Sequence, residues 1–321
     1  MVRLISVCLS KRARLTRERV SRTRLPHAHC RLINSCTVKN PSQSAFSNIV
    51  QRAKETNKPV VVAGCVPQGD RKLKGLEDTI GMTIVDPLRD ERGWAFTDQP
   101  DPVNGFRFLA EAYAASDPDF DGRVTVPVLW DQVRGEIVSN ESSDILRMLD
   151  TAFAEWASEG PTLYPEELRA EIDALNERIY DTVNNGVYRA GFATTQAAYE
   201  AAVVPLFESL AWLDEHLCDR RYLTGDVPTE ADWRLFTTLV RFDPVYHGHF
   251  KCNLQRLSDF PDLWAYVRDL YQLPGVAETV DLDHIKRHYY VTHAAINPTR
   301  VVPLGPELDF LAPHDRARLA T

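Results

Sequence analysis

The sequence predicts a small α/β domain followed by an all-helical domain, and three observations support this. Residues 124–148 have the pattern of strand, turn, strand and helix. Residues 199–217 place a row of apolar side chains at helical spacing. A chain of 321 residues that is 44% hydrophobic is also long enough for two domains, each with its own core.

The α/β pattern begins with residues 124–130, whose β-branched spacing suits a buried strand. Residues 135–139 form the returning arm of a hairpin, with Gly135 in the turn. The helix that follows has apolar residues on one face: Ile145, Leu146, Leu149 and Phe153. Asn140, Glu141 or Ser142 could cap this helix, whose first backbone N–H groups would suit a carboxylate. An ordinary helix cap is the alternative interpretation.

The helical pattern extends over residues 165–290. Pro205 interrupts the apolar row and should kink or split its helix. Thr229 and Asp232 resemble a capping box, which has a role in folding and not in catalysis. Residues 296–321 contain four prolines, so we expect an extended C-terminal tail.

Charge is distributed unevenly, although the net charge is only −8. Residues 1–31 contain nine basic side chains and one acidic one, whereas the remaining 290 contain 28 basic and 44 acidic. The acidic body has no evident means of holding nucleic acid. The leader has the composition of a mitochondrial transit peptide. Its apolar residues show little amphipathic regularity, so the favoured interpretation is a disordered segment that is not a native, folded part of the protein. A basic arm for nucleic acid is the remaining alternative.

Cysteine content and hydropathy restrict the compartment and the cofactors. Six cysteines in so long a chain do not suggest a disulfide scaffold, so we expect a reducing, cytoplasmic location. No run approaches the roughly 18 apolar residues of a membrane span. His247, His249 and Cys252 offer zinc-type donors, but a fourth ligand is not evident, so no metal is expected.

Residues 32–68 carry two cysteine motifs, NSCTVKNPS around Cys36 and GCVPQ around Cys65. This segment resembles the N-terminal domain of the tRNA methylthiotransferases, in which each motif supplies one cysteine to an iron–sulfur cluster. The resemblance implies that Cys36 and Cys65 are vestigial cluster ligands. The radical SAM motif Cys-x-x-x-Cys-x-x-Cys of that family is absent, so a working methylthiotransferase is not expected.

From about Arg71 to Pro298 the motifs change. They include RKLKGLEDTI, VDPLRDERGWAF, GEIVSNESSDI, YLTGDVPTEADWRLFTTLVRFDPVYHGHFKC and HYYVTHAAINP. This part resembles the glutathionyl-hydroquinone reductases, the Xi class of glutathione transferases. The resemblance implies an α/β remnant of a thioredoxin-like domain, followed by an all-α glutathione-transferase C-terminal domain. It also implies a homodimer that uses glutathione as co-substrate and acts on quinone-derived small molecules.

The resemblance assigns glutathione contacts to residues of the α/β domain: Trp94, Val126, Pro127, Glu141 and Ser142. Pro127 would be the cis-proline of the thioredoxin-like fold, and the Val126 backbone would pair with the cysteinyl part of glutathione. Glu141 and Ser142 would bind the γ-glutamyl end at the helix start.

Two tyrosines match those that line the quinone pocket of the family, where they donate hydrogen bonds to the aromatic hydroxyls. The run NNGVYRAGFA places Tyr188 in a glycine-flanked, poorly helical turn, and HYYVTH places Tyr289 near the end of the helical domain. Core packing is the alternative role for each. Tyr290 is an adjacent candidate.

The family nucleophile belongs to a Cys-Pro-Trp-Ala motif, and this chain contains no Cys-Pro pair. Cys65 follows a predicted strand at residues 59–63 and precedes a probable helix, so it could replace that nucleophile. A predicted helix at residues 45–54 argues against this, because a thioredoxin-like domain begins with its strand. The favoured explanation is a fused chain whose activity is impaired, and a non-catalytic glutathione-binding dimeric scaffold is the alternative.

These interpretations divide the chain into five parts. They are a leader at 1–31, a methylthiotransferase-like fragment at 32–70, a partial thioredoxin-like domain at 71–160, an all-α domain at 161–295 and a tail at 296–321.

Overall fold

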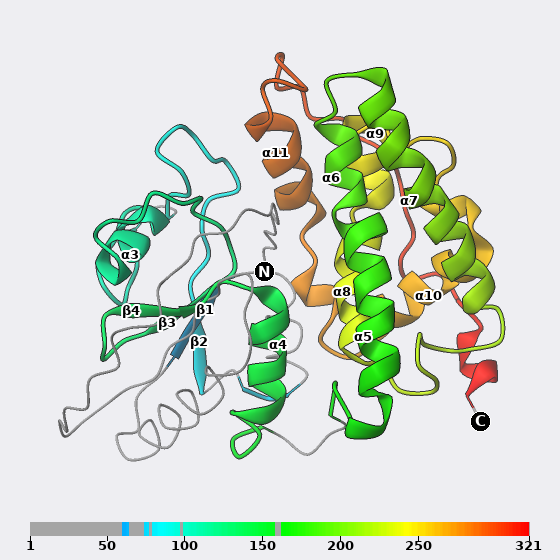
Figure 1. Ribbon diagram of the computed structural model, residues 1–321, viewed down its shortest axis with the longest axis horizontal. Coiled ribbons are helices and arrows are strands. Elements are labelled where there is room, and N and C mark those ends of the chain that lie inside the picture. The colour runs from blue at the N-terminus through cyan, green and yellow to red at the C-terminus, as the bar shows by residue number, and fades with distance from the viewer. Residues whose placement is uncertain (1–59, 64–73, 77–78, 97–98, 158–161, 321) are drawn as a thin grey trace. The chain divides into compact units, whose positions relative to one another are not determined.

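A computed structural model describes residues 60–63, 74–76, 79–96, 99–157 and 162–320, and the chain divides into two units between residues 159 and 160 (Figure 1). The first unit contains a four-stranded mixed sheet in the order β2-β1-β3-β4. Its strands are β1 (Val60–Ala63), β2 (Ile80–Met82), β3 (Val128–Asp131) and β4 (Glu136–Ser139). β1 runs parallel to β2 and antiparallel to β3, which forms a hairpin with β4.

β3 begins later than the sequence predicts. The strand starts at Val128, because Pro127 has no N–H to donate and the preceding Thr125 is hydrogen-bonded to a side chain of another element. The cis form predicted for the Val126–Pro127 bond is confirmed. The predicted turn at Gly135 is also confirmed, with φ at 69°.

β1 occupies the interior of this sheet, although it comes from the segment that resembles the methylthiotransferases. Val61 pairs with Gly81 on one side and with Trp130 on the other. The fragment at 32–70 and the domain at 71–160 therefore share one sheet. The helix expected at 45–54 lies outside the described residues, as do Cys36 and Cys65.

Helices cover both faces of the sheet. Side chains alternate along β3, so Leu129 packs with α4 (Ser142–Thr151), whereas Val128 and Trp130 pack with α3 (Leu109–Ser116). Figure 1 shows the strands between these two helices. This double coverage holds both ends of the hairpin in place.

The second unit is helical. Its α-helices are α5 (Arg169–Arg178), α6 (Gly186–Gly191), α7 (Gln196–His216), α8 (Glu230–Leu239), α9 (His247–His249), α10 (Pro261–Gln272) and α11 (Leu282–Thr292). Two π-helical segments are η2 (Ile179–Asn184) and η3 (Phe242–Tyr246). Short 3₁₀ helices are η1 (Glu166–Leu168), η4 (Leu257–Asp259), η5 (Ala277–Thr279) and η6 (Arg316–Leu319). None of the described helices combines the length and apolar character needed to cross a bilayer.

Two helix predictions have different outcomes. The predicted split at Pro205 is wrong, because α7 is one helix of 21 residues that contains Pro205. Buried Val203 and Leu206 pack the helix before and after Pro205, so tertiary contacts override the local preference. The capping box of α8 is confirmed: the Thr229 N–H donates to the Asp232 carboxylate at 2.7 Å.

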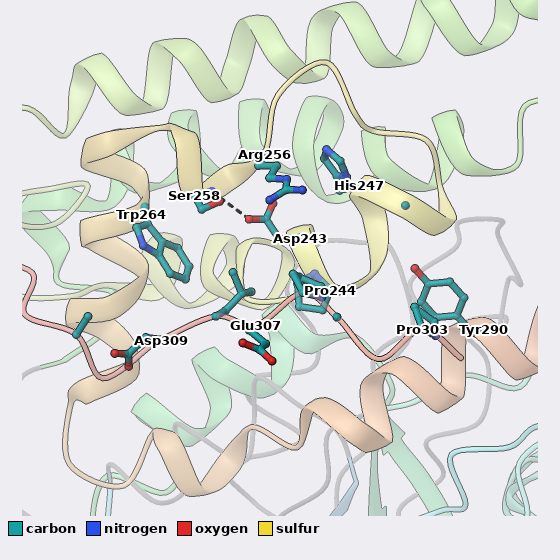
Figure 2. A pocket seen from close by; sticks show the side chains of 15 residues that line it. Asp243, Pro244, His247, Arg256, Ser258, Trp264, Tyr290, Pro303, Glu307 and Asp309 are labelled. Carbon is teal, nitrogen blue, oxygen red and sulfur yellow. Dashed lines mark hydrogen bonds between the residues drawn. The ribbon is translucent and has the colours of Figure 1, made fainter. Parts of the chain in front are cut away.

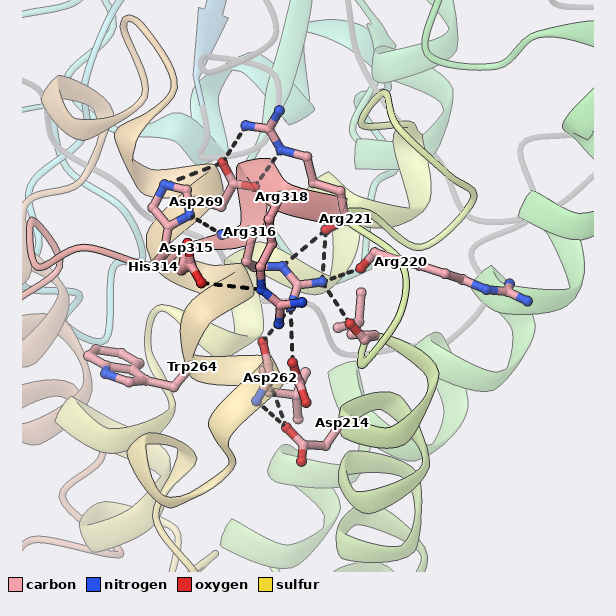
Figure 3. A network of polar contacts seen from close by, with 12 residues as sticks. Asp214, Arg220, Arg221, Asp262, Trp264, Asp269, His314, Asp315, Arg316 and Arg318 are labelled. Carbon is pink, nitrogen blue, oxygen red and sulfur yellow. Dashed lines mark hydrogen bonds and ion pairs between the residues drawn. The ribbon is translucent and has the colours of Figure 1, made fainter. Parts of the chain in front are cut away.

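Arg316 anchors the C-terminal tail (Figure 3). Residues 293–315 contain no regular helix or strand, and η6 follows them. The Arg316 guanidinium is 2% exposed and donates to the carbonyls of Leu217 and Arg221, at 2.9 and 3.0 Å. Because Leu217 is the C-cap of α7, its bond to this cation satisfies a carbonyl at the end of the helix.

Candidate active site

Thr125 links the two backbone segments of the predicted glutathione site. Its carbonyl accepts a hydrogen bond from the Tyr113 hydroxyl of α3 at 2.9 Å, and its hydroxyl accepts one from the Asn140 amide at 2.5 Å. Burial raises the pKa of Tyr113 to about 12, so this phenol remains a donor at neutral pH. Thr125 precedes Val126, and Asn140 precedes Glu141. The hydrogen bond between Thr125 and Asn140 thus fixes the spacing between the predicted ligand positions at Val126 and Glu141.

The start of α4 has no side-chain cap at its N-cap position. Glu141 occupies the N-cap position with extended backbone, and its side chain makes no capping hydrogen bond. An ordinary side-chain cap therefore does not describe this helix start. Ser142 is the first helical residue, and the positive end of the helix dipole favours a carboxylate there.

Trp94, a predicted glutathione contact, lies in the protein core. Its indole is fully buried, in the same apolar cluster as Val126. The Arg89 guanidinium lies 5.8 Å from the ring centroid. Burial lowers the pKa of Arg89, and the nearby Arg123 lowers it further. The sequence motifs did not reveal that these two cations lie close together.

In the helical unit, three buried tyrosine hydroxyls meet. Tyr188 comes from α6, Tyr246 from the end of η3 and Tyr289 from α11. The Tyr289 hydroxyl is hydrogen-bonded to that of Tyr188 and, at 2.9 Å, to that of Tyr246. The structure thus brings together the two predicted tyrosines and adds a third, Tyr246, which the sequence marks only as an aromatic residue in VYHGHF. We call these three residues the tyrosine cluster.

The poorly helical turn predicted around Tyr188 is wrong, because Tyr188 lies within α6, directly after η2. Gly191 is needed for close packing. A Cβ there would lie 2.2 Å from the ring of Phe250, whose centroid is 5.4 Å from that of Tyr188. This glycine, the last residue of α6, thus admits an aromatic neighbour of Tyr188.

The tyrosine cluster is suited to hydrogen-bond donation. Burial raises the pKa of Tyr188 and of Tyr289 well above the usual value for a phenol, so both are neutral at physiological pH. A neutral phenol can donate to an oxygen that gains negative charge during a reaction. Tyr290, on the same helix, is only half buried and faces His249, with ring centroids 4.6 Å apart.

The proposed zinc donors are used differently. His249 Nε2 is 3.1 Å from His293 Nδ1, and the Cys252 thiol is buried near the Val187 carbonyl. In the part of the chain that the structure describes, no three His, Cys, Asp or Glu side chains gather as a metal site would require.

Comparison with known proteins identifies the family. Residues 70–152 match the family model "Glutathione S-transferase, N-terminal domain", and residues 196–269 match "Glutathione S-transferase, C-terminal domain". Glutathionyl-hydroquinone reductase YqjG of Escherichia coli K12 is 53% identical over 251 residues, which are 77% of this chain and 76% of that protein. The chain belongs to the glutathionyl-hydroquinone reductases. The glutathione-bound structure of YqjG has a TM-score of 0.78 at 50% identity, covering 80% of this chain and 88% of that one.

The N-terminal segment of this reductase-family chain has a different relationship. Residues 12–84 match the model "Uncharacterized protein family UPF0004". The threonylcarbamoyladenosine tRNA methylthiotransferase of Mus musculus is 52% identical over 58 residues, which are 17% of this chain and 10% of that protein. These matches support a fused chain.

Neither cysteine among the described residues has the features of the reductase nucleophile. Burial raises the pKa of Cys252 to about 12, so its sulfur is a thiol at neutral pH, and Cys218 is exposed on the surface. A nucleophile of this family must instead be a thiolate near the bound substrate.

The buried His249 should make the stability of the protein depend on pH. Burial, followed by the charge of Lys251, lowers the pKa of His249 from 6.5 to about 4. The unfolded chain therefore takes up this proton first, and the free energy of unfolding should fall as the pH drops from about 6.5 towards 4. Denaturant unfolding across this window should show a shallower decline for His249→Gln.

The partly exposed neighbour His247 provides the matched control. His247→Gln should retain the slope of the original protein. Equal slopes for His249→Gln and the original protein would contradict the assignment.

Proposed function

We propose that this chain reduces glutathionyl-hydroquinones to hydroquinones with glutathione as the reductant. The strongest support is the hydroxyl contact between Tyr188 and Tyr289, which forms a buried donor pair in a chain of this family. Glutathione binding is supported by the start of α4, where the N-cap Glu141 makes no side-chain cap. It is also supported by the predicted position of Val126 before a cis proline. By resemblance we further propose a homodimer, and we propose the cytoplasm because the reaction needs a reduced cysteine.

The reaction proceeds in two thiol steps. A protein thiolate attacks the sulfur of the thioether, so an S–S bond forms while the bond from sulfur to the ring carbon breaks. Before the attack the ring carbon takes up a proton while a ring hydroxyl loses one, so the electron pair of the breaking bond passes through the ring to that oxygen. The resulting phenolate takes up a proton, and hydroquinone leaves. The thiolate of free glutathione then attacks the protein–glutathione disulfide, which regenerates the cysteine and releases glutathione disulfide.

Within this scheme the tyrosine cluster would stabilise charge. As the bond from carbon to sulfur breaks, electron density moves onto the ring oxygens, and the hydroxyls of Tyr188 and Tyr289 would donate to them. Tyr246 would hold the Tyr289 hydroxyl in place through its own hydrogen bond. Arg89, Arg123 and the start of α4 would receive the carboxylates of glutathione.

We assign the nucleophile to Cys65. β1 ends at Ala63, which pairs with Val128, the residue after the cis proline. Cys65 follows Ala63 by two residues in the sequence, so the order of strand and cysteine is that of a thioredoxin-like domain. The other role for Cys65 is that of an inherited cluster ligand.

Tyr289→Phe should lower kcat/KM for a glutathionyl-hydroquinone by about a hundredfold, because it removes one donor to the developing charge. Steady-state release of hydroquinone measures this effect. Tyr199→Phe is the matched control, since its hydroxyl bonds the Lys251 carbonyl on the surface and the variant should retain full activity. Equal rates for the two variants would show that the Tyr289 hydroxyl does not act as a donor in the reaction.

The absence of a Cys-Pro pair favours one alternative, a non-catalytic glutathione-binding scaffold. Retention on immobilised glutathione, combined with an assay for hydroquinone, separates the two functions. Retention with release above the uncatalysed rate supports the reductase, whereas retention without release selects the scaffold. Glu141→Gln should weaken retention; unchanged retention would show that the helix start does not bind glutathione.

A further inference from the structure

A second cavity, of about 510 Å³, lies in the helical unit and is lined by none of the tyrosine cluster (Figure 2). One wall consists of residues from η3, α9, α10 and the segment before η4. The other wall is the C-terminal tail at residues 303–309. Its volume is within the range of sites for small organic ligands.

The tail is held at both ends of this cavity. The Lys286 ammonium donates to the Leu304 carbonyl at 2.7 Å, and the Gln272 amide donates to the Phe310 carbonyl at 2.9 Å. The Phe310 ring is buried and stacks on Tyr271, with centroids 4.9 Å apart. Because both ends are fixed, residues 305–309 cross the cavity without filling it.

Charges of opposite sign face each other across the cavity. Figure 2 shows the Arg256 guanidinium, together with the imidazole of His247 as a polar neighbour, on one side, and the Glu307 and Asp309 carboxylates on the other. No ion pair joins these two sides within the described residues. The buried Asp243 carboxylate also lines the cavity, where it accepts the N–H groups that begin η4, at 2.7 and 3.1 Å.

We propose that this cavity binds a zwitterionic ligand, a free amino acid or a short peptide. Its carboxylate would lie against Arg256 and His247, and its ammonium group against Glu307 and Asp309. A ligand with separated charges satisfies both sides at once, which neither a simple anion nor a simple cation can do.

Aromatic rings at the two ends of the cavity support an organic ligand. Trp264 lies at one end and Tyr290 at the other, as Figure 2 shows. Such rings pack against apolar side chains and also attract ammonium groups. The inference does not depend on the proposed reductase activity, since none of these residues has a part in it.

Titration calorimetry on the full chain tests the proposal with the tripeptide Gly-Phe-Gly. The form with free ends should bind, and the form with acetylated and amidated ends should bind at least about tenfold more weakly. Arg256→Gln and Glu307→Gln should each weaken binding of the free peptide by about tenfold. Arg287→Gln is the matched control, because its exposed guanidinium pairs with Asp283 and is not among the residues that line the cavity.

Three outcomes would overturn the proposal. These are no binding of the free peptide, equal binding of the capped peptide, and unchanged affinity in the Arg256 and Glu307 variants. Glu141→Gln should leave peptide binding intact. Loss of binding in that variant would instead place the peptide at the proposed glutathione site.

Discussion

Replacing Cys65 with serine is expected to abolish hydroquinone release, with a loss on the order of 10³-fold or more. A serine hydroxyl is not ionised at neutral pH and does not form the mixed disulfide that the reaction requires. Glutathione binding should persist, because we propose that it depends on the backbone at Val126 and on the start of α4. Single-turnover release of hydroquinone and calorimetric binding of glutathione measure the two effects separately.

The other cysteines make this experiment specific. Cys218→Ser changes an exposed thiol and should leave turnover intact. Mass spectrometry of the original protein during turnover should find glutathione attached to Cys65. If Cys65→Ser retains the original turnover, the cysteine is an inherited cluster ligand, and the proposed nucleophile is wrong.

Asp232→Ala should destabilise the helical unit by about 3 kcal/mol or more. The carboxylate is fully buried and accepts hydrogen bonds from the Leu223 N–H, the Thr229 N–H and the Tyr266 hydroxyl, at 2.9, 2.7 and 2.8 Å. Alanine would leave these three donors buried without an acceptor. Equilibrium unfolding in urea, followed by circular dichroism, measures the change.

Asp283 provides the comparison for this prediction. It also lies in the first turn of a helix, but its side chain is 77% exposed and pairs with Arg287 on the surface. Asp283→Ala should therefore cost less than about 1 kcal/mol. Similar losses for both variants would show that the buried hydrogen bonds of Asp232 contribute little.

The sequence was informative where the controlling interactions are local. The turn at Gly135, the helix start at Ser142 and the capping box at Thr229 each depend on neighbours within a few residues. Their patterns were therefore visible without the fold. The Tyr188–Tyr289 pair was found only through family resemblance, because no local pattern joins residues on separate helices.

Other features depend on packing between distant segments. The continuity of α7 through Pro205 reflects buried apolar side chains that contact other helices, which a local rule does not include. Tyr246 meets Tyr289 only because η3 and α11 pack together. Thr125 likewise gains its importance from partners on α3 and before α4, and neither partner is evident from the sequence around it.

The position of β1 shows how little a sheet requires of the ancestry of its strands. The pairs that Val61 makes with Gly81 and Trp130 use backbone N–H and C=O groups, which every residue except proline carries in full. A short extended segment from an unrelated gene can thus replace a lost strand if its length and polarity suit the site. Gene fusion at such a point preserves the architecture of the recipient, while the donated piece needs none of its original neighbours.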